Sequence, residues 1–299
     1  MTLIELIESG EDRFAEANIA FGHGTTNARD EAAWLVLWAL GLPLDTPLDD
    51  HGSEEKEPLA PADIERCAML FEKRISTRKP AAYLTHEAWL QGVSFYVDER
   101  VIVPRSLIAE LIADGSLDYW LHESTQAVLD VCTGNGSLAI IAALTYPEVI
   151  VTASDISTDA LAVARINVDR HELQSRIGLV ESDGLAGSDL LARGSFDLIL
   201  CNPPYVNAKS MAALPPEYLA EPSLALDGNR SGGTDGMDFI RTLLSDAPAH
   251  MAPGAVLVLE VGNERNNFEA AFPYLEVVWL ETSAGDDQVL VVSREALTQ

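Results

Sequence analysis

Two short motifs in the second half of the chain carry residues that could bind a small ligand and a planar amide. The first is DVCTGNGSLAI at residues 130–140, where two glycines separate an apolar run from a helix-like run. Gly134 and Gly136 let the backbone approach a ligand closely, and the start of a helix offers unpaired N–H groups. The motif has no GK[ST], so it is not a Walker loop, and it does not match the full GxGxxG dinucleotide-binding motif either. A tight turn without a ligand is the alternative.

The second motif is CNPPYV at residues 201–206, directly after an apolar run typical of a buried strand. Pro203 and Pro204 remove two backbone donors and stiffen the turn, which leaves carbonyl oxygens as acceptors. Together with the side-chain oxygen of Asn202, these carbonyls could hold a planar NH₂ group by both hydrogens. Tyr205 offers a flat face for the same group. The motif predicts recognition of an amide or an amino-substituted base.

Two aspartates lie where two further predicted strands end. Asp155 closes VTASD and could accept both hydroxyls of a ribose, while Asp183 closes VESD and could accept from an adenine amino group. Each is also a reasonable turn residue. Because the carboxyl ends of parallel strands share one edge of a sheet, the two aspartates and the glycine loop together predict a nucleoside-containing cofactor.

Alternating strands and helices after about residue 105 must position these motifs. Apolar runs that read as buried strands predict a parallel sheet covered on both faces, with the last two strands forming an antiparallel edge. The predicted strands cover residues 127–131, 149–154, 177–181, 196–201, 255–261, 275–280 and 288–292. The predicted helices cover residues 106–121, 137–145, 158–171, 235–247 and 265–272.

The first part of the chain predicts a different architecture. Apolar residues at helical spacing indicate a helical domain over residues 1–82, with Asn27 capping its second helix. Trp34 and Trp38 lie one turn apart and are interpreted as core. A Pro-rich, acidic stretch between Leu42 and Pro61 predicts a loop. A strand-like pattern then predicts a β-hairpin linker over residues 83–104.

The composition limits the partners and the chemistry. The formal charge of −28 disfavours direct binding of nucleic acid, which needs a basic surface, and is compatible with a basic protein partner. General solubility, including adaptation to a salty cytoplasm, is the alternative explanation of the charge. The three cysteines form no CxxC pair, and the N-terminus lacks a basic secretory start, so a cytoplasmic protein with no membrane span is expected. Scattered histidines indicate no metal site. Cys132 and Cys201 flank the site but have no neighbouring base in the sequence, so a nucleophilic cysteine is disfavoured.

The combination of these motifs resembles the S-adenosylmethionine-dependent methyltransferases that act on planar NH₂ groups. The segment FYVDERVIVPRSLIAELI at residues 95–112 is similar to the protein N(5)-glutamine methyltransferases. Its VPRS is most similar to the branch that modifies the third large-subunit ribosomal protein. The branch that modifies class I release factors, usually IPRP here, is the alternative, and amino-methylation of DNA or RNA is a more distant one.

This resemblance implies a Rossmann-like, seven-stranded methyltransferase domain over residues 105–299, behind the helical domain and the hairpin. It also implies that Asp155 binds ribose and that Asp183 lies near adenine. Arg105 would help to shape the cleft, with a contact at the surface or with the N-terminal helices as the alternative. The cofactor-binding loop would comprise Asp130, Cys132, Thr133, Gly134, Asn135 and Gly136. The substrate glutamine would be held by Asn202, Pro203, Pro204 and Tyr205, with Asn202 also close to the cofactor.

The resemblance further implies a basic ribosomal protein as partner, methylated while free of rRNA. Asn135 and Ser137 depart from the residues common in this branch, and the stretch GNRSGGTDG at residues 228–236 is longer than usual. Neither departure removes a group that the chemistry needs. The sequence carries no signal for an oligomeric state.

Overall fold

The computed structural model describes residues 1–48, 58–122 and 124–299. Residues 49–57, within the loop predicted between Leu42 and Pro61, lie outside the described residues. The chain forms two compact units: one comprises Met1–Ala88 and Leu214–Glu221, and the other comprises Trp89–Ala213 and Pro222–Gln299. The units follow the chain differently from the predicted domains, because the hairpin turn lies in the second unit and a short later segment lies in the first.

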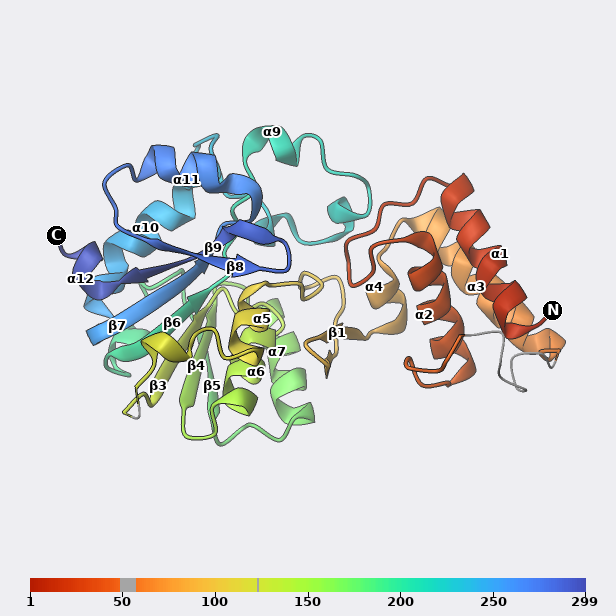
Figure 1. The fold of residues 1–299 in the computed structure, drawn as a ribbon, viewed down its shortest axis with the longest axis horizontal. Coiled ribbons are helices and arrows are strands. Elements are labelled where there is room, and N and C mark those ends of the chain that lie inside the picture. The colour runs from red at the N-terminus through yellow and green to blue at the C-terminus, as the bar shows by residue number, and fades with distance from the viewer. Residues whose placement is uncertain (49–57, 123) are drawn as a thin grey trace. The chain divides into compact units, whose positions relative to one another are not determined.

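The first unit is helical. Thr2 and Glu5 form a capping box at the start of its first helix, and Asn27 caps the second, as predicted, by accepting from the Asp30 amide at 2.9 Å. The apolar faces of the first three helices pack together, with Phe14 edge-on to Phe71 at a centroid distance of 5.4 Å. The helices are α1 (Leu3–Glu16), α2 (Ala28–Leu40), α3 (Pro61–Thr77) and α4 (Ala81–Thr85) (Figure 1).

Two predictions for this region are wrong in part. Trp34 is buried, but Trp38 is 38% exposed because it lies in the last turn of α2, just before Gly41 ends the helix in the left-handed conformation. The strand-like pattern also begins later than Tyr83, which lies in α4. The hairpin itself consists of β1 (Ala88–Leu90) and β2 (Val93–Phe95).

The second unit is built on a seven-stranded sheet, as predicted. Its strand order is β5-β4-β3-β6-β7-β9-β8. Strands β3 to β7 pair in parallel, while β9 pairs antiparallel with both β7 and β8. The strands are β3 (Ala127–Val131), β4 (Ile150–Asp155), β5 (Ile177–Glu181), β6 (Phe196–Cys201), β7 (Met251–Glu260), β8 (Val278–Thr282) and β9 (Gly285–Ser293).

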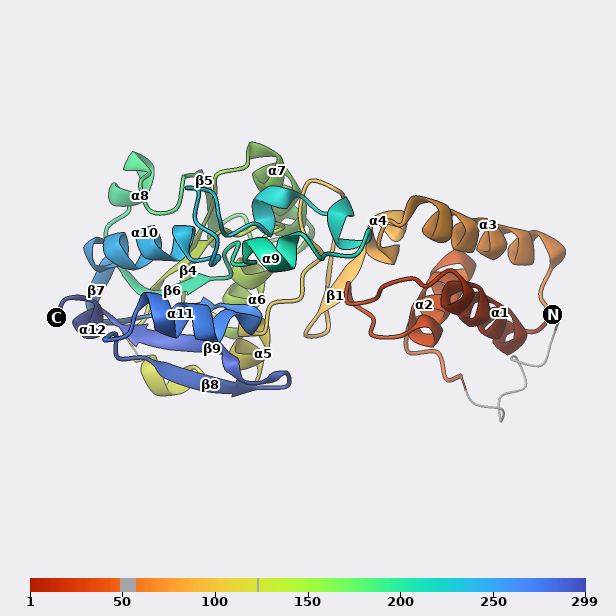
Figure 2. The same ribbon diagram turned by 90° about the horizontal axis from the view of Figure 1, so that it is seen from above.

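Helices cover both faces of this sheet (Figures 1 and 2). One face packs against α5 (Ile108–Ala113), α6 (Ser137–Thr145) and α7 (Thr158–Arg170). The other packs against α10 (Asp238–Asp246) and α11 (Arg265–Ala271). The remaining short helices are α8 (Ser188–Leu191), α9 (Ala208–Met211) and α12 (Arg294–Leu297). Across the described ranges, no helix combines the length and the apolar character needed to cross a membrane.

One predicted helix is broken in the structure. The helix predicted over residues 106–121 ends at Ala113, and a separate 3₁₀ turn follows at Asp118–Trp120. Gly115 lies between them with φ of +78°, a left-handed conformation that a right-handed helix cannot contain. The break leaves α5 as a short helix packed against α6 and β7.

Candidate active site

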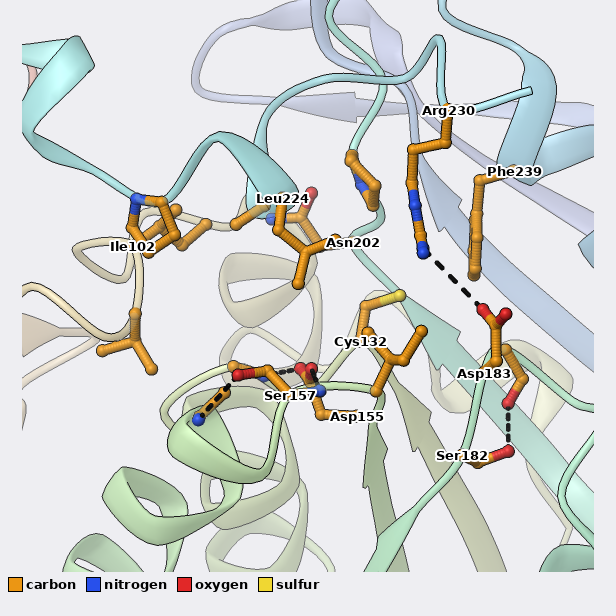
Figure 3. Close-up of a pocket in the computed structure, with 18 of the residues that line it drawn as sticks. Ile102, Cys132, Asp155, Ser157, Ser182, Asp183, Asn202, Leu224, Arg230 and Phe239 are labelled. Atoms are coloured by element: carbon orange, nitrogen blue, oxygen red, sulfur yellow. Dashed lines mark hydrogen bonds and ion pairs between the residues drawn. The ribbon is translucent and has the colours of Figure 1, made fainter. Parts of the chain in front are cut away.

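A pocket opens at the carboxyl ends of the four neighbouring parallel strands β3 to β6 (Figure 3). It encloses about 670 Å³, including space open to solvent. Residues from six of the predicted positions line it: Cys132, Gly134, Asp155, Asp183, Asn202 and Pro204. The predicted residues Asp130, Thr133, Asn135, Gly136, Pro203 and Tyr205 are not among its lining residues.

The glycine loop after β3 follows one wall of this pocket. Cys132, Gly134 and Gly136 have positive φ values of 60°, 55° and 84°. A Cβ at Gly136 would lie 3.3 Å from the Cβ of Ala164 in α7, whereas a Cβ at Gly134 would meet nothing within 4 Å. Gly136 therefore serves close packing, and Gly134 keeps the pocket wall open to a ligand.

Asp155 connects this loop to the next strand. One carboxylate oxygen accepts from the Gly134 amide at 2.9 Å, and the other accepts from the Ser157 amide at 2.9 Å. Burial raises the pKa of Asp155, while these amide hydrogen bonds oppose the shift. The carboxylate is thus held in one orientation at the pocket wall.

Asp130 lies beneath the loop. It is fully buried, and one of its oxygens accepts from the Thr133 hydroxyl at 2.5 Å and from the Ala139 amide at 3.1 Å. Burial raises its pKa to about 7, despite these two hydrogen bonds. Asp130 and Thr133 therefore support the loop from beneath and do not line the pocket. The sequence analysis had assigned both to the cofactor-binding residues.

Asn167 is a loop-positioning residue that the sequence analysis missed. It lies in α7, is fully buried, and donates to the carbonyl oxygens of Asn135 at 2.9 Å and Tyr96 at 3.0 Å. Its own side-chain oxygen accepts from the Tyr96 amide at 2.7 Å. One side chain therefore fixes the glycine loop and the segment after the hairpin. No local pattern marks it, because its partners are 32 and 71 residues away.

The NPPY motif follows β6, beside the glycine loop. Val131 at the end of β3 pairs with Cys201 at the end of β6, so the next residues, Cys132 and Asn202, leave the sheet side by side. Both line the pocket, as Figure 3 shows. Burial raises the pKa of the Cys201 thiol far above its usual value, which disfavours a nucleophilic role for it.

Tyr205 is held from behind by a buried carboxylate that the sequence analysis also missed. Its hydroxyl donates to one oxygen of Glu260 at 3.3 Å. The other oxygen of Glu260 accepts from the Ser106 hydroxyl at 2.6 Å and the Leu107 amide at 2.9 Å. A Cβ at Gly262 would lie 2.5 Å from the Tyr205 ring. Glu260 at the end of β7 thus holds the tyrosine hydroxyl, and Gly262 just after the strand leaves room for its ring.

The pocket end that contains Asp183 holds two further residues that were not predicted. Arg230 lies with its Nη1 3.7 Å from the Asp183 carboxylate, and Phe239 of α10 stands beside the pair (Figure 3). Arg230 belongs to the stretch that is longer than usual in the sequence. The sequence analysis noted the length of this stretch but did not single out the arginine within it.

The polar groups of the pocket suit a nucleoside that carries no phosphate. Two carboxylates, Asp155 and Asp183, line it and can accept hydrogen bonds from hydroxyl or amino groups. The two arginines in the lining are each paired with a carboxylate: Arg100 with Asp98 at 2.6 Å, and Arg230 with Asp183. The negative charge of a polyphosphate would be repelled by these carboxylates, whereas the cationic sulfur of S-adenosylmethionine would be attracted to them.

Known proteins with similar sequences decide the family. A family model described as methyltransferase small domain matches residues 116–222. The chain is 48% identical over 298 residues to a ribosomal protein uL3 glutamine methyltransferase of Bordetella pertussis, with 99% of this chain and 96% of the relative covered. A protein of the same description from Burkholderia pseudomallei is 48% identical over 99% of this chain and 95% of the relative. The chain belongs to the ribosomal protein uL3 glutamine methyltransferase family.

Membership of this family confirms the resemblance inferred from NPPY and VPRS, and with it the methyltransferase activity and the use of S-adenosylmethionine. Among solved structures, the chain is similar to the catalytic domain of hMettl16 in complex with an RNA hairpin, with a TM-score of 0.51. That likeness covers 77% of this chain and 80% of the other at 14% identity. It therefore speaks for the fold alone.

The ion pair between Arg230 and Asp183 leads to a prediction about cofactor affinity. Arg230→Gln is expected to weaken S-adenosylmethionine binding by about two- to fivefold, because Asp183 then loses the charge that orients it, and partly exposed ion pairs contribute little more. Isothermal titration calorimetry measures the effect. Arg265→Gln is the matched control, since Arg265 pairs with Glu269 within α11 at 2.8 Å and neither residue lines the pocket. Equal or tighter binding by the Arg230 variant would contradict the prediction.

Proposed function

We propose that this enzyme transfers a methyl group from S-adenosylmethionine to the side-chain amide nitrogen of a glutamine in ribosomal protein uL3. The observation that carries the proposal is the juxtaposition of the glycine loop and the NPPY motif. The β3–β6 register puts Cys132 and Asn202 at the same edge of one pocket. Family membership supports uL3 as the substrate.

In this proposal, Asp155 binds the ribose hydroxyls and Asp183 accepts from the adenine amino group. Cys132 and the loop through Gly136 surround the methionine part, with Asp130 and Thr133 supporting that loop from beneath. When bound, S-adenosylmethionine supplies an electrophilic methyl group on a positively charged sulfur. Both carboxylates reach the pocket from neighbouring strand ends, which supports these assignments.

The substrate amide needs orientation more than a base. Its nitrogen is a weak nucleophile because its lone pair is delocalised into the carbonyl group. Asn202 and the Pro203 carbonyl accept both amide hydrogens, and the face of Tyr205 covers the amide plane. Orientation of this kind contributes about 7–11 kcal/mol in the best model systems. As the N–C bond forms and the C–S electron pair returns to sulfur, the methylated amide becomes acidic and releases its extra proton.

The charge of the chain supports a free protein substrate. A formal charge of −28 attracts a basic ribosomal protein and repels rRNA. We therefore place the reaction in the cytoplasm before uL3 joins the large subunit. The same charge argues against DNA or RNA as the substrate, since phosphate binding needs lysine and arginine.

The proposal predicts methylation of purified uL3 by the purified enzyme with isotope-labelled S-adenosylmethionine. Mass spectrometry of the product should show one added CH₂ group on a single glutamine. The initial rate at subsaturating uL3 is expected to fall by about tenfold or more from low salt to physiological salt, because screening weakens the attraction between acidic enzyme and basic substrate.

A class I release factor and assembled large subunits serve as parallel substrates in the same assay. The expected order of rates is free uL3 first, with both others far slower. Methylation of the release factor in preference to uL3 would overturn the substrate assignment. A faster reaction on assembled subunits would overturn only the proposed timing.

A further inference from the structure

The stretch GNRSGGTDG at residues 228–236 contacts both halves of the proposed active site, and it belongs wholly to the second unit. Within it, Arg230 lines the cofactor pocket and pairs with Asp183, which follows β5. The main chain before and after Arg230 is hydrogen-bonded to residues that follow NPPY. This 228–236 loop therefore joins the place proposed for the cofactor to the place proposed for the substrate amide.

Main-chain contacts hold the two ends of this loop against the NPPY motif. Val206, the residue after the motif, forms an isolated parallel bridge with Asp227. Its carbonyl oxygen accepts from the Gly228 amide at 3.1 Å. At the other end of the loop, a Cβ at Gly236 would overlap the carbonyl oxygen of Tyr205. The loop therefore passes directly against the backbone that carries the tyrosine.

The Asn229 side chain connects the two ends of the loop to each other and to Val206. Its Nδ2 donates to the Val206 carbonyl at 3.0 Å and to the Asp227 carboxylate at 2.7 Å. Its Oδ1 accepts from the Gly236 amide at 2.9 Å. Because both N–H groups and the oxygen of this amide are hydrogen-bonded, the side chain is held in one orientation. One residue thus fixes the backbone that follows NPPY.

The next residue extends from the same loop to the cofactor pocket. The Arg230 guanidinium faces Asp183 across 3.7 Å (Figure 3), and the two side chains are 33% and 65% exposed. A pair as exposed as this holds the loop only weakly. Asp183 is the carboxylate that we propose accepts from the adenine amino group. A bound cofactor therefore adds contacts at this pair, one peptide bond away from Asn229.

We propose that Asn229 is a positioning residue that links the cofactor pocket to the NPPY loop, so that S-adenosylmethionine and uL3 bind cooperatively. With the cofactor bound, the Arg230 side of the loop is ordered, and Asn229 holds Val206 and Tyr205 in place before the substrate amide arrives. Without the cofactor, part of the binding free energy of uL3 is spent on ordering the loop. Linkage makes the effect reciprocal. The inference rests on the roles proposed above for Asp183 and Tyr205.

The decisive measurement is the affinity of the full chain for purified uL3 with and without saturating S-adenosylhomocysteine, which keeps the nucleoside but has no methyl group to donate. The parent should bind uL3 about fivefold or more tightly with this ligand present. In Asn229→Ala this coupling factor should fall to about twofold or less. Without the ligand, the variant should bind uL3 within about twofold of the parent. A merely structural role would instead weaken uL3 binding equally in both conditions.

Ser231→Ala is the matched control. Ser231 lies in the same loop and is exposed, and its contact with Asp238 comes from the main-chain amide, which alanine keeps. Its variant should show the coupling factor of the parent. Arg230→Gln should reproduce the loss, and the double variant with Asn229→Ala should lose no more than either single one. Full coupling in Asn229→Ala, or none in the parent, would overturn the inference. Failure of the parent to bind uL3 in either condition would instead overturn the proposed substrate.

Hydrogen exchange on the parent protein tests the same link without a variant, and so remains decisive even if Asn229→Ala does not fold. The amides of Val206, Gly228 and Gly236 are all hydrogen-bonded within the connection between the loop and the NPPY motif. Addition of S-adenosylhomocysteine should slow exchange at these three amides, because ordering at Arg230 extends to them through Asn229. Protection of residues 132–136 with no change at the three amides would contradict the inference.

Discussion

Replacement of Asn202 by alanine is expected to lower kcat by about 100-fold or more, the scale observed when one preorganised polar group is removed from a reacting centre. Asn202 follows β6, lines the pocket and leaves the sheet beside Cys132. In the proposed mechanism its side-chain oxygen accepts a hydrogen bond from the substrate amide and orients it, and alanine has no such acceptor. Initial rates with uL3 at saturating S-adenosylmethionine measure the loss.

Cofactor affinity separates this effect from damage to the pocket. The Asn202→Ala protein should bind S-adenosylmethionine within about threefold of the parent, so that the loss falls on turnover. Asn266→Ala is the matched control, because Asn266 is exposed on α11 outside the pocket. Near-normal turnover by Asn202→Ala with cofactor bound would sink the proposed role of the NPPY motif.

The sheet and its main helices could be predicted from the sequence because their signals are local. The apolar run of α6 predicts Ser137–Thr145 to the residue, and Ser157 marks the start of α7 by accepting from the Ala160 amide at 3.1 Å. The predicted helix boundaries are wrong where a single glycine interrupts an apolar pattern of helical spacing. Gly115 ends α5 early, and Gly236, with φ of +79°, delays the start of α10 to Asp238.

Only those residues of the candidate site that lie at the ends of strands could be predicted from the sequence. Cys132, Asp155, Asp183 and Asn202 each follow a predictable strand, and parallel topology brings such residues to one edge. Supporting residues such as Asn167 give no comparable signal, because what they do depends on partners that only the folded chain brings near. The same holds for the packing of Leu214–Glu221 with the helical unit, which no composition shift announces.

The buried carboxylate of Glu260 carries the second large expected effect. Glu260→Ala leaves the hydroxyls of Ser106 and Tyr205 and the Leu107 amide without this acceptor. The free energy of unfolding should fall by about 1–3 kcal/mol, the range for a buried donor that is left without its partner. Since Tyr205 also loses the contact that fixes its plane, kcat should fall by about tenfold or more. Urea unfolding and initial rates measure the two effects.

Glu260→Gln separates the hydrogen bond to Tyr205 from the support of Ser106 and Leu107. The amide keeps an acceptor oxygen for Ser106 and Leu107, so stability should recover most of the loss, whereas the Tyr205 hydroxyl then faces an N–H donor in place of an acceptor oxygen. Burial raises the pKa of Glu260, because it disfavours the charged form of the carboxyl group. Glu281→Ala is the control, as Glu281 is exposed on β8. If Glu260→Gln regains stability and turnover alike, the carboxylate serves only the packing of β7 against α5. If turnover stays low while stability recovers, the Glu260 oxygen that accepts from Tyr205 orients the tyrosine that we propose covers the substrate amide.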